Sequence, residues 1–253
     1  MVFTTAILKA QQGELKSGVY HVDSVLIQNG QEHKMKLKVQ GNTTYLALLS
    51  MHSSTLDPGK TNHPPRVLLD REELIIVKEG PMTITINDTS KVLTSGSIAL
   101  IEAGDAQSFS NASDKVISYD VLGFKAKTLV NISRGKANGG SLLKDWNDLV
   151  VKKTLKGESR PVFDKPSSMF ERFEVHSTML NPNEDSHPVH THRAEEIMLL
   201  LKGDITMHID KESYHAVAGS IILVRPDVPH NLTNTGKEPC IYYAIKWFSN
   251  PTN

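Results

Sequence analysis

The sequence of 253 residues has little of what marks several large classes of protein. Its single cysteine, Cys240, excludes an intramolecular disulfide, and its apolar neighbours predict a buried small residue. Lysine plus arginine and aspartate plus glutamate number 28 each, no basic stripe stands out, and aromatic residues make up only 6%. This composition argues against nucleic acid as a partner.

Long hydrophobic runs are also absent. No stretch approaches the roughly 20 apolar residues that a membrane-spanning helix needs. The N-terminal residues lack the basic segment and long apolar stretch of a signal peptide. We therefore expect no membrane partner and a cytoplasmic protein, although a signal peptide that had been removed would leave no trace.

Short segments with alternating apolar and polar residues are abundant. Examples are Met-Thr-Ile-Thr-Ile-Asn at 82–87 and Asp-Ile-Thr-Met-His-Ile-Asp at 204–210, with glycine, proline and Asn-Asp between such segments. This pattern predicts an all-β protein built as a sandwich or barrel. Long helical periodicity is absent, and at most 141–151 is expected to hold a short helix.

The chain also repeats itself at an offset of 123 or 124 residues. The matching parts are 72–80 with 195–203, Gly96 with Gly219, Asn111 with Asn234, and 51–58 with 175–182. Such a repeat predicts two homologous β domains. We place them at 1–127 and 128–253, with a linker near 125–145.

Potential metal ligands are concentrated in the second half. The segment His190-Thr-His192-Arg-Ala-Glu-Glu196 precedes Gly203 by six residues, and His230 follows a proline. Residues two apart on a strand point to the same face, and Glu196 keeps that parity. Three imidazoles and one carboxylate suit one divalent ion of Mn, Fe, Ni, Co or Zn. These four residues are therefore predicted to bind a metal.

The same residues carry a family resemblance. His190-X-His192-X3-Glu196-X6-Gly203 resembles the first cupin motif, and Gly219 to Pro229-His230-X3-Asn234 resembles the second. The chain is thus similar to bicupins, which implies two tandem jelly-roll β-barrels, each with its site inside the barrel. The second motif departs from the family pattern, because Arg225 and Asp227 replace the usual proline and glycine at turn positions.

In the first half the ligand positions are degenerate. Glu73 is kept, but Gln107 stands for the third histidine. The first two histidines fall on Arg66 and Leu68 or, with the offset placed differently, on Val67 and Leu69. We expect this half to be metal-free and to serve packing, dimerisation or cover of the other barrel. The alternative is that Arg66, Glu73 and Gln107 line a polar pocket that binds a ligand without metal.

Candidates for binding a substrate are His187, Arg225, Tyr242 and Lys246. Alternation along the last strand places either Tyr242 with Lys246 or Tyr243 with Trp247 inside the barrel. Glu195 is expected to face away from Glu196 and to form a salt bridge or a loop contact.

Two functions are compatible with these residues. The first is a metal-dependent enzyme acting on a small polar metabolite, and the resemblance implies dioxygenase, isomerase, decarboxylase or hydrolase chemistry without choosing among them. The second is a non-catalytic, metal-stabilised protein that binds a sugar or an organic acid. Cupins commonly pair through exposed sheet edges, so a homodimer is a further expectation.

Overall fold

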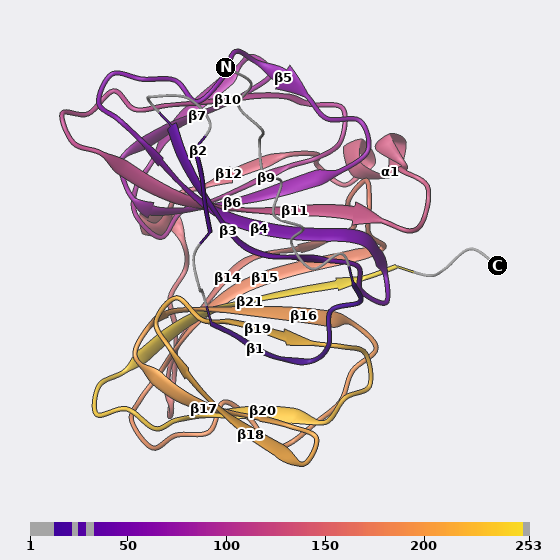
Figure 1. Cartoon of the computed structure of the whole chain (residues 1–253), viewed down its shortest axis with the longest axis vertical. Helices are drawn as coiled ribbons and strands as arrows, with labels where there is room; N and C mark the ends of the chain where they lie inside the picture. The colour runs from indigo at the N-terminus through magenta and orange to yellow at the C-terminus, as the bar shows by residue number, and fades with distance from the viewer. Residues whose placement is uncertain (1–12, 22–24, 29–32, 250–253) are drawn as a thin grey trace, which may run out of the picture.

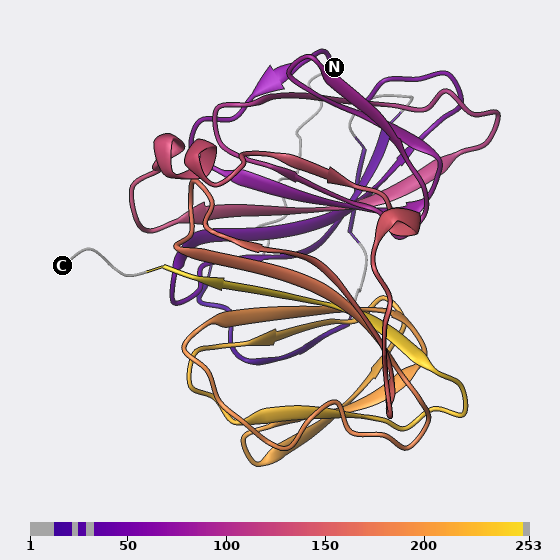
Figure 2. The ribbon, with the colours of Figure 1, turned by 180° about the vertical axis from the view of Figure 1, so that it is seen from behind.

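The computed structural model describes residues 13–21, 25–28 and 33–249. In this part of the chain 21 strands form four sheets, and the sheets build two barrels stacked on one another (Figure 1). The two seven-stranded sheets face each other at the centre, and the smaller sheets lie on the outside, as the reverse view in Figure 2 also shows. The predicted all-β class with two tandem barrels is confirmed.

The N-terminal barrel has a large sheet in the order β12-β9-β6-β11-β4-β3-β2 and a small sheet in the order β5-β10-β7-β8. Its strands from the first half of the chain are β2 (Val25–Gln28), β3 (His33–Gly41), β4 (Leu46–Leu56), β5 (Arg66–Val67), β6 (Glu72–Glu79), β7 (Met82–Ile86), β8 (Thr89–Leu93), β9 (Ile98–Ile101), β10 (Ala106–Ser110) and β11 (Ile117–Ala126).

The C-terminal barrel repeats this plan, with a large sheet in the order β1-β19-β16-β21-β15-β14-β13 and a small sheet in the order β18-β17-β20. Its strands from the second half of the chain are β13 (Lys152–Thr154), β14 (Gly157–Lys165), β15 (Arg172–Leu180), β16 (Glu195–Lys202), β17 (Asp204–Ile209), β18 (Glu212–Val217), β19 (Ile221–Val224), β20 (His230–Asn234) and β21 (Cys240–Phe248).

Each barrel also receives a strand from the other half of the chain. The N-terminal strand β1 (Gly18–Tyr20) pairs with β19 in the C-terminal barrel, where Figure 1 shows it at the lower sheet. The strand β12 (Leu142–Lys144) pairs with β9 in the N-terminal barrel. The segment expected to be a linker is therefore partly a strand, and the division at residue 127 stays a prediction.

Helix is scarce among the described residues. The helix α1 (Ile132–Ala137) begins after Asn131, whose side chain accepts a hydrogen bond from the Arg134 amide. The short helix expected within 141–151 is reduced to the 3-10 helix η1 (Trp146–Asp148). No helix in the described ranges is long and apolar enough to cross a membrane.

The large sheets are apolar on both faces, which explains why β6 and β16 read as continuous apolar runs. On β16, Ile197 and Leu199 pack into a core shared by both barrels, whereas Met198 and Leu200 pack inside the C-terminal barrel. Equivalent alternation on β6 divides its side chains between the shared core and the N-terminal interior. The two barrels are thus joined by a hydrophobic core of their own.

Glu195 is a buried polar contact within this interface. Its carboxylate accepts hydrogen bonds from Thr43 Oγ1 at 2.6 Å, from the amides of Thr44 and Tyr45 at 2.6 and 3.2 Å, and from Trp247 Nε1 at 2.9 Å. The loop contact predicted for Glu195 is confirmed. The loop 43–45 belongs to the N-terminal half, so Glu195 ties the first residue of β16 to the other barrel.

Glu72 makes the reciprocal contact from the N-terminal barrel. It accepts hydrogen bonds from Ser167 Oγ at 2.8 Å, Ser168 Oγ at 2.6 Å and the Met169 amide at 2.8 Å. Burial raises the pKa of Glu72 to about 7, and the nearby Glu102 raises it as well, while the hydrogen bonds oppose the shift. The interface therefore contains two equivalent glutamate contacts, one from each barrel.

Candidate metal centre

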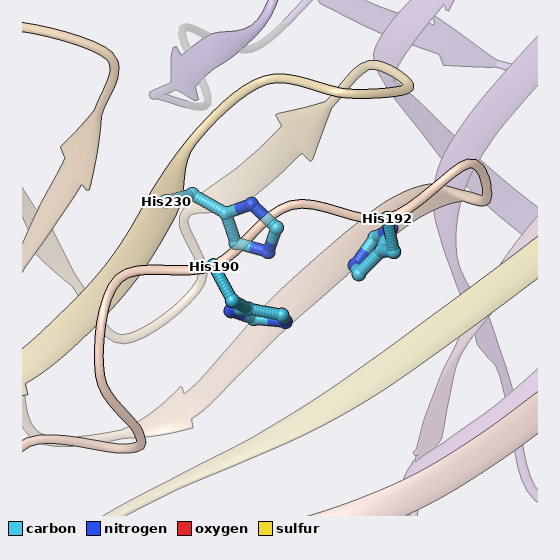
Figure 3. A group of neighbouring side chains, drawn as sticks. All are labelled: His190, His192 and His230. Atoms are coloured by element: carbon cyan, nitrogen blue, oxygen red, sulfur yellow. The ribbon is translucent and has the colours of Figure 1, made fainter.

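The three predicted histidines come together at one end of the C-terminal barrel. His190 and His192 lie on the segment before β16, and His230 is the first residue of β20. The backbones of His190 and His230 are joined by two hydrogen bonds of 3.0 and 3.3 Å. One ring nitrogen from each of the three lies within 4.8 Å of the others, and Figure 3 shows the rings around a common space.

Backbone carbonyls fix the orientation of two of these rings. His192 Nδ1 lies 2.9 Å from the Ala194 carbonyl oxygen, and His230 Nδ1 lies 2.9 Å from the Val228 carbonyl oxygen. A carbonyl oxygen only accepts, so each Nδ1 must carry the proton. In the neutral tautomer, the Nε2 lone pairs of both rings therefore point into the site.

Glu196 lies beside two of the three rings. Its Oε2 lies 3.0 Å from His192 Nε2 and 3.3 Å from His230 Nε2, and its side chain is almost fully buried. Two ligand atoms at right angles on an ion with bonds of about 2.1 Å are about 3.0 Å apart. His190 Nδ1 and His230 Nε2 are buried without a hydrogen-bond partner. Converging lone pairs and unpartnered nitrogens fit a divalent transition metal.

The electrostatics of the site favour the ligand forms of His190 and Glu196. Burial, together with the smaller effect of the neighbouring histidines, lowers the pKa of His190 to about 4, so the ring is neutral at pH 7. Burial alone would raise the pKa of Glu196, but the adjacent rings of His192 and His230, when they carry a proton on Nε2, and the charge of Lys246 hold it well below its usual range. The hydrogen bond to Glu196 raises the pKa of His192 against the effect of burial.

Two cavities adjoin the histidines. An outer pocket of about 330 Å³ is lined by His190, His192 and Lys246 together with Arg172, Glu174, Ala194, Trp247 and Phe248. An inner cavity of about 40 Å³ lies beside Glu196 and His230 and is lined in part by His187, Met198, Tyr242 and Lys246. Open space on both sides of the histidines leaves room for a ligand.

The alternatives for the last strand are resolved. Tyr242 packs in the C-terminal interior and Lys246 lines both cavities, whereas Tyr243 and Trp247 belong to the core shared by the barrels. Burial raises the pKa of the Tyr242 hydroxyl, so it is neutral at pH 7. Tyr242 and Lys246 are therefore the pair inside the barrel.

The other two predicted substrate-binding residues differ in their placement. The His187 ring centre lies 3.9 Å from that of His190, and His187 lines the inner cavity. Arg225 lines neither cavity; it contacts Glu14 at 2.7 Å and Thr44 Oγ1 at 3.2 Å, both from the N-terminal half. The structure thus brings His187 to the site and Arg225 to the interface.

Asp227 occupies the turn position where the cupin pattern has glycine. Its φ of +59° lies in the left-handed region, which aspartate tolerates better than most residues. Its amide donates to the His192 carbonyl oxygen at 2.8 Å. The substitution keeps the turn and holds the segment that carries His192.

Arg172 and Glu174 were not among the predicted residues. Glu174 pairs in register with Lys246 across β15 and β21, and Arg172 contacts Glu174 at 2.9 Å. Both are charged residues on a strand, and only the strand register reveals that they border the histidines. The sequence held no signal for this beyond their charge.

The corresponding place in the N-terminal barrel has different chemistry. Arg66 of β5 pairs with Gln107 of β10, in the same way as His190 bridges to His230 in the other barrel. Arg66 and Leu68, and not Val67 and Leu69, are therefore the equivalents of His190 and His192. Glu73 accepts from Gln107 Nε2 at 2.6 Å and contacts Arg66 at 3.3 Å. Protein groups already satisfy this carboxylate. Within the described residues, a group of three side chains that could hold a metal ion is found in the C-terminal barrel alone.

Comparisons with known proteins agree with this fold. Residues 176–246 match the family model of the cupin domain. The transcriptional regulator PuuR of Escherichia coli is 37% identical over 49 residues, which are 19% of this chain and 26% of that protein. The match therefore spans about a quarter of the length of this curated relative.

Solved structures match over nearly the whole chain. The oxalate decarboxylase of Lactobacillus farciminis in its formate complex has a TM-score of 0.71 at 14% identity, covering 94% of this chain and 87% of that one. The Bacillus subtilis oxalate decarboxylase with Mn(II) centres has a TM-score of 0.70 at 11% identity, covering 94% and 79%. At these identities the likeness shows the fold alone. The predicted resemblance to cupins is confirmed.

Proposed function

We propose that the C-terminal barrel binds one divalent transition metal through His190, His192, Glu196 and His230 and acts as an enzyme on a small polar metabolite. The observation that carries this proposal is the convergence of the His192 and His230 Nε2 atoms on Glu196 Oε2. The donor set suits Mn, Fe, Ni, Co or Zn. The Mn(II) centres of a protein with the same fold support the inclusion of manganese.

The residues around the site suit this role. A bound metal would supply a Lewis acid that polarises a ligand oxygen or lowers the pKa of a bound water. The carbonyls of Ala194 and Val228 hold two imidazoles in the ligand tautomer, and Glu196 holds the negative charge. Glu196 and His230 are almost fully buried, so bulk water screens these interactions little. Dioxygenase, isomerase, decarboxylase and hydrolase reactions are all compatible with these groups.

A second candidate function is a metal-stabilised module that binds a small molecule without turning it over. The local similarity to a transcriptional regulator, 37% identity over 49 residues, is the observation that favours it. In this alternative the same four residues hold the metal, and a sugar or an organic acid occupies the outer pocket. Turnover of a metabolite panel separates the two candidates.

Elemental analysis of protein purified without added metal tests the site itself. We expect close to one transition-metal ion per chain, and much less than that in the double variant His190→Ala with His192→Ala. The matched control is Arg66→Ala with Leu68→Ala in the other barrel, which should leave the metal content unchanged. Equal metal in the histidine variant and the wild type would refute the site. The cytoplasmic location and the homodimer stay predictions.

A further inference from the structure

Resting on the proposed function, we propose that the ligand of the metal site is a small carboxylate anion and that Lys246 binds its charge. Lys246 lies on β21 between two carboxylates, pairing in register with Glu196 on one side and Glu174 on the other. Its side chain is 22% exposed and reaches both the outer pocket and the inner cavity. Lys246 therefore borders both cavities next to the proposed metal site.

The ammonium group of Lys246 has no strong partner in the described part of the chain. Its closest charged group is Glu196 Oε1 at 3.9 Å, too far for a hydrogen bond, and no hydrogen bond leaves its Nζ. An ammonium carries three donors and is costly to bury without acceptors. An anionic ligand in the pocket would supply the missing acceptors.

The other charged groups of the outer pocket already satisfy one another. Arg172 contacts both carboxylate oxygens of Asp164 at 2.8 Å and also contacts Glu174 at 2.9 Å. Glu174 in turn accepts from His176 Nδ1 at 3.2 Å if that nitrogen carries the proton. Lys246 is thus the cation of this pocket that remains for a ligand.

The net charge around the site points the same way. With a divalent ion in place, Glu196 offsets one of its charges, and Lys246 adds another positive charge. The three imidazoles are neutral as ligands. A site with positive net charge attracts anions and disfavours cations.

The dimensions favour a carboxylate over a phosphate ester. The inner cavity of about 40 Å³ has space for a few water-sized groups. The outer pocket of about 330 Å³ is near the lower end of the range for metabolite sites. Phosphate sites commonly use helix N-termini, glycine-rich loops or arginine forks. Neither cavity is lined by a helix or a glycine, and the one arginine of the outer pocket, Arg172, already contacts Asp164 and Glu174.

The test uses Co(II)-loaded whole protein, with cobalt absorption as the readout of binding. Glycolate and its neutral isostere glycolamide are the two probes. We expect glycolate to bind about tenfold to a hundredfold more tightly than glycolamide, as a charge-assisted hydrogen bond allows. Lys246→Gln should abolish most of this preference at unchanged cobalt stoichiometry, and Lys246→Arg should restore part of it. The exposed Lys211→Gln is the matched control and should behave as wild type.

The outcomes separate this inference from the function on which it rests. Failure of the wild type to hold cobalt would refute the metal site itself. Equal affinity of wild type for the two probes would overturn the anion proposal, whatever the variants do. An undiminished preference in Lys246→Gln with full cobalt would overturn the role of Lys246. If Lys246→Gln does not hold cobalt, Lys246→Met is judged by the same two measurements, and loss of cobalt there too would make Lys246 a support of the metal site and overturn its assignment to the ligand.

Discussion

The interiors of the two barrels carry different side chains on equivalent strands. Arg66 pairs with Gln107 in one barrel, and His190 bridges to His230 in the other. The two glutamates, Glu73 and Glu196, are both buried, but Glu73 receives a proton-bearing amide whereas Glu196 faces imidazole lone pairs. The N-terminal barrel therefore satisfies its buried carboxylate with protein groups, whereas in the C-terminal barrel the carboxylate is free to bind the proposed metal.

What the two barrels share is the set of residues that shapes the fold. Asn111 donates to the Leu56 and Lys115 carbonyls, and Asn234 donates in the same way to those of Leu180 and Glu238. Gly96 and Gly219 have φ values of +86° and +92°, a turn conformation that favours glycine. The asparagines and glycines that occur in both barrels therefore maintain the fold.

His187 belongs with these shared features. Its Nδ1 lies 3.0 Å from the Pro188 carbonyl oxygen, and His63 Nδ1 lies 2.8 Å from the Pro64 carbonyl oxygen at the equivalent turn. A histidine present in the copy without metal ligands serves the turn there. The comparison therefore favours a structural role for His187 over the predicted contact with substrate.

Exchanging the ligand positions of the two barrels should have the largest effect on metal binding. The triple variant His190→Arg, His192→Leu and His230→Gln gives the C-terminal barrel the residues of the N-terminal one. We expect it to fold, because the N-terminal barrel accommodates these residues, and to lose metal affinity by more than about a hundredfold. Elemental analysis and circular dichroism check the two expectations. A folded variant with wild-type metal content would contradict the assignment.

The reciprocal exchange should create a second site. Arg66→His, Leu68→His and Gln107→His place three imidazoles beside Glu73 and remove the arginine that contacts it. We expect the metal content to rise from one towards two ions per chain, with the added ion held more weakly because no supporting contacts have been selected for it. Calorimetric titration with Co(II) counts the sites. A single binding event would show that more than the ligands separates the barrels.

The repeat and the candidate metal ligands could be predicted because both are defined by the spacing of residues along the chain. The swapped strands β1 and β12 were missed because three residues are too few for a periodic pattern. Three of the four partners of Glu195 lie about 150 residues away in the chain and the fourth, Trp247, lies 52 away, so local pattern could indicate only that Glu195 faces away from Glu196. Arg225 was misplaced for the same reason, since its partners come from the other half.

The two glutamate contacts at the interface should differ in their effects on stability and on metal binding. Glu195→Ala leaves four donors without an acceptor, which should lower the free energy of unfolding by about 4 kcal/mol. Glu72→Ala leaves three donors without an acceptor and should lower the free energy of unfolding by somewhat less. Because Glu195 precedes a predicted ligand, its variant should also weaken metal binding by about tenfold, whereas Glu72→Ala should not. Denaturant unfolding and metal titration measure the two effects, and equal metal affinities would show that the interface does not brace the site.

The smallest expected effect is a pH dependence confined to Glu72. Its pKa is raised by burial from 4.5 to about 7, so its ionisation costs free energy in the folded state and none in the unfolded state. Below about pH 4.5 the carboxyl is neutral in both states and the fold bears no penalty. Between about pH 4.5 and pH 7 the penalty grows to at most about 3 kcal/mol, and above this range it stays constant. Glu72→Gln removes the ionisation, so the stability of this variant relative to wild type should increase between pH 5 and pH 8.

Guanidinium unfolding at both pH values measures the difference, with the exposed Glu212→Gln as a control of equal charge change. If Glu72→Gln follows the wild-type pH slope, the carboxyl is already ionised in the fold at pH 5, and its three hydrogen bonds outweigh its burial.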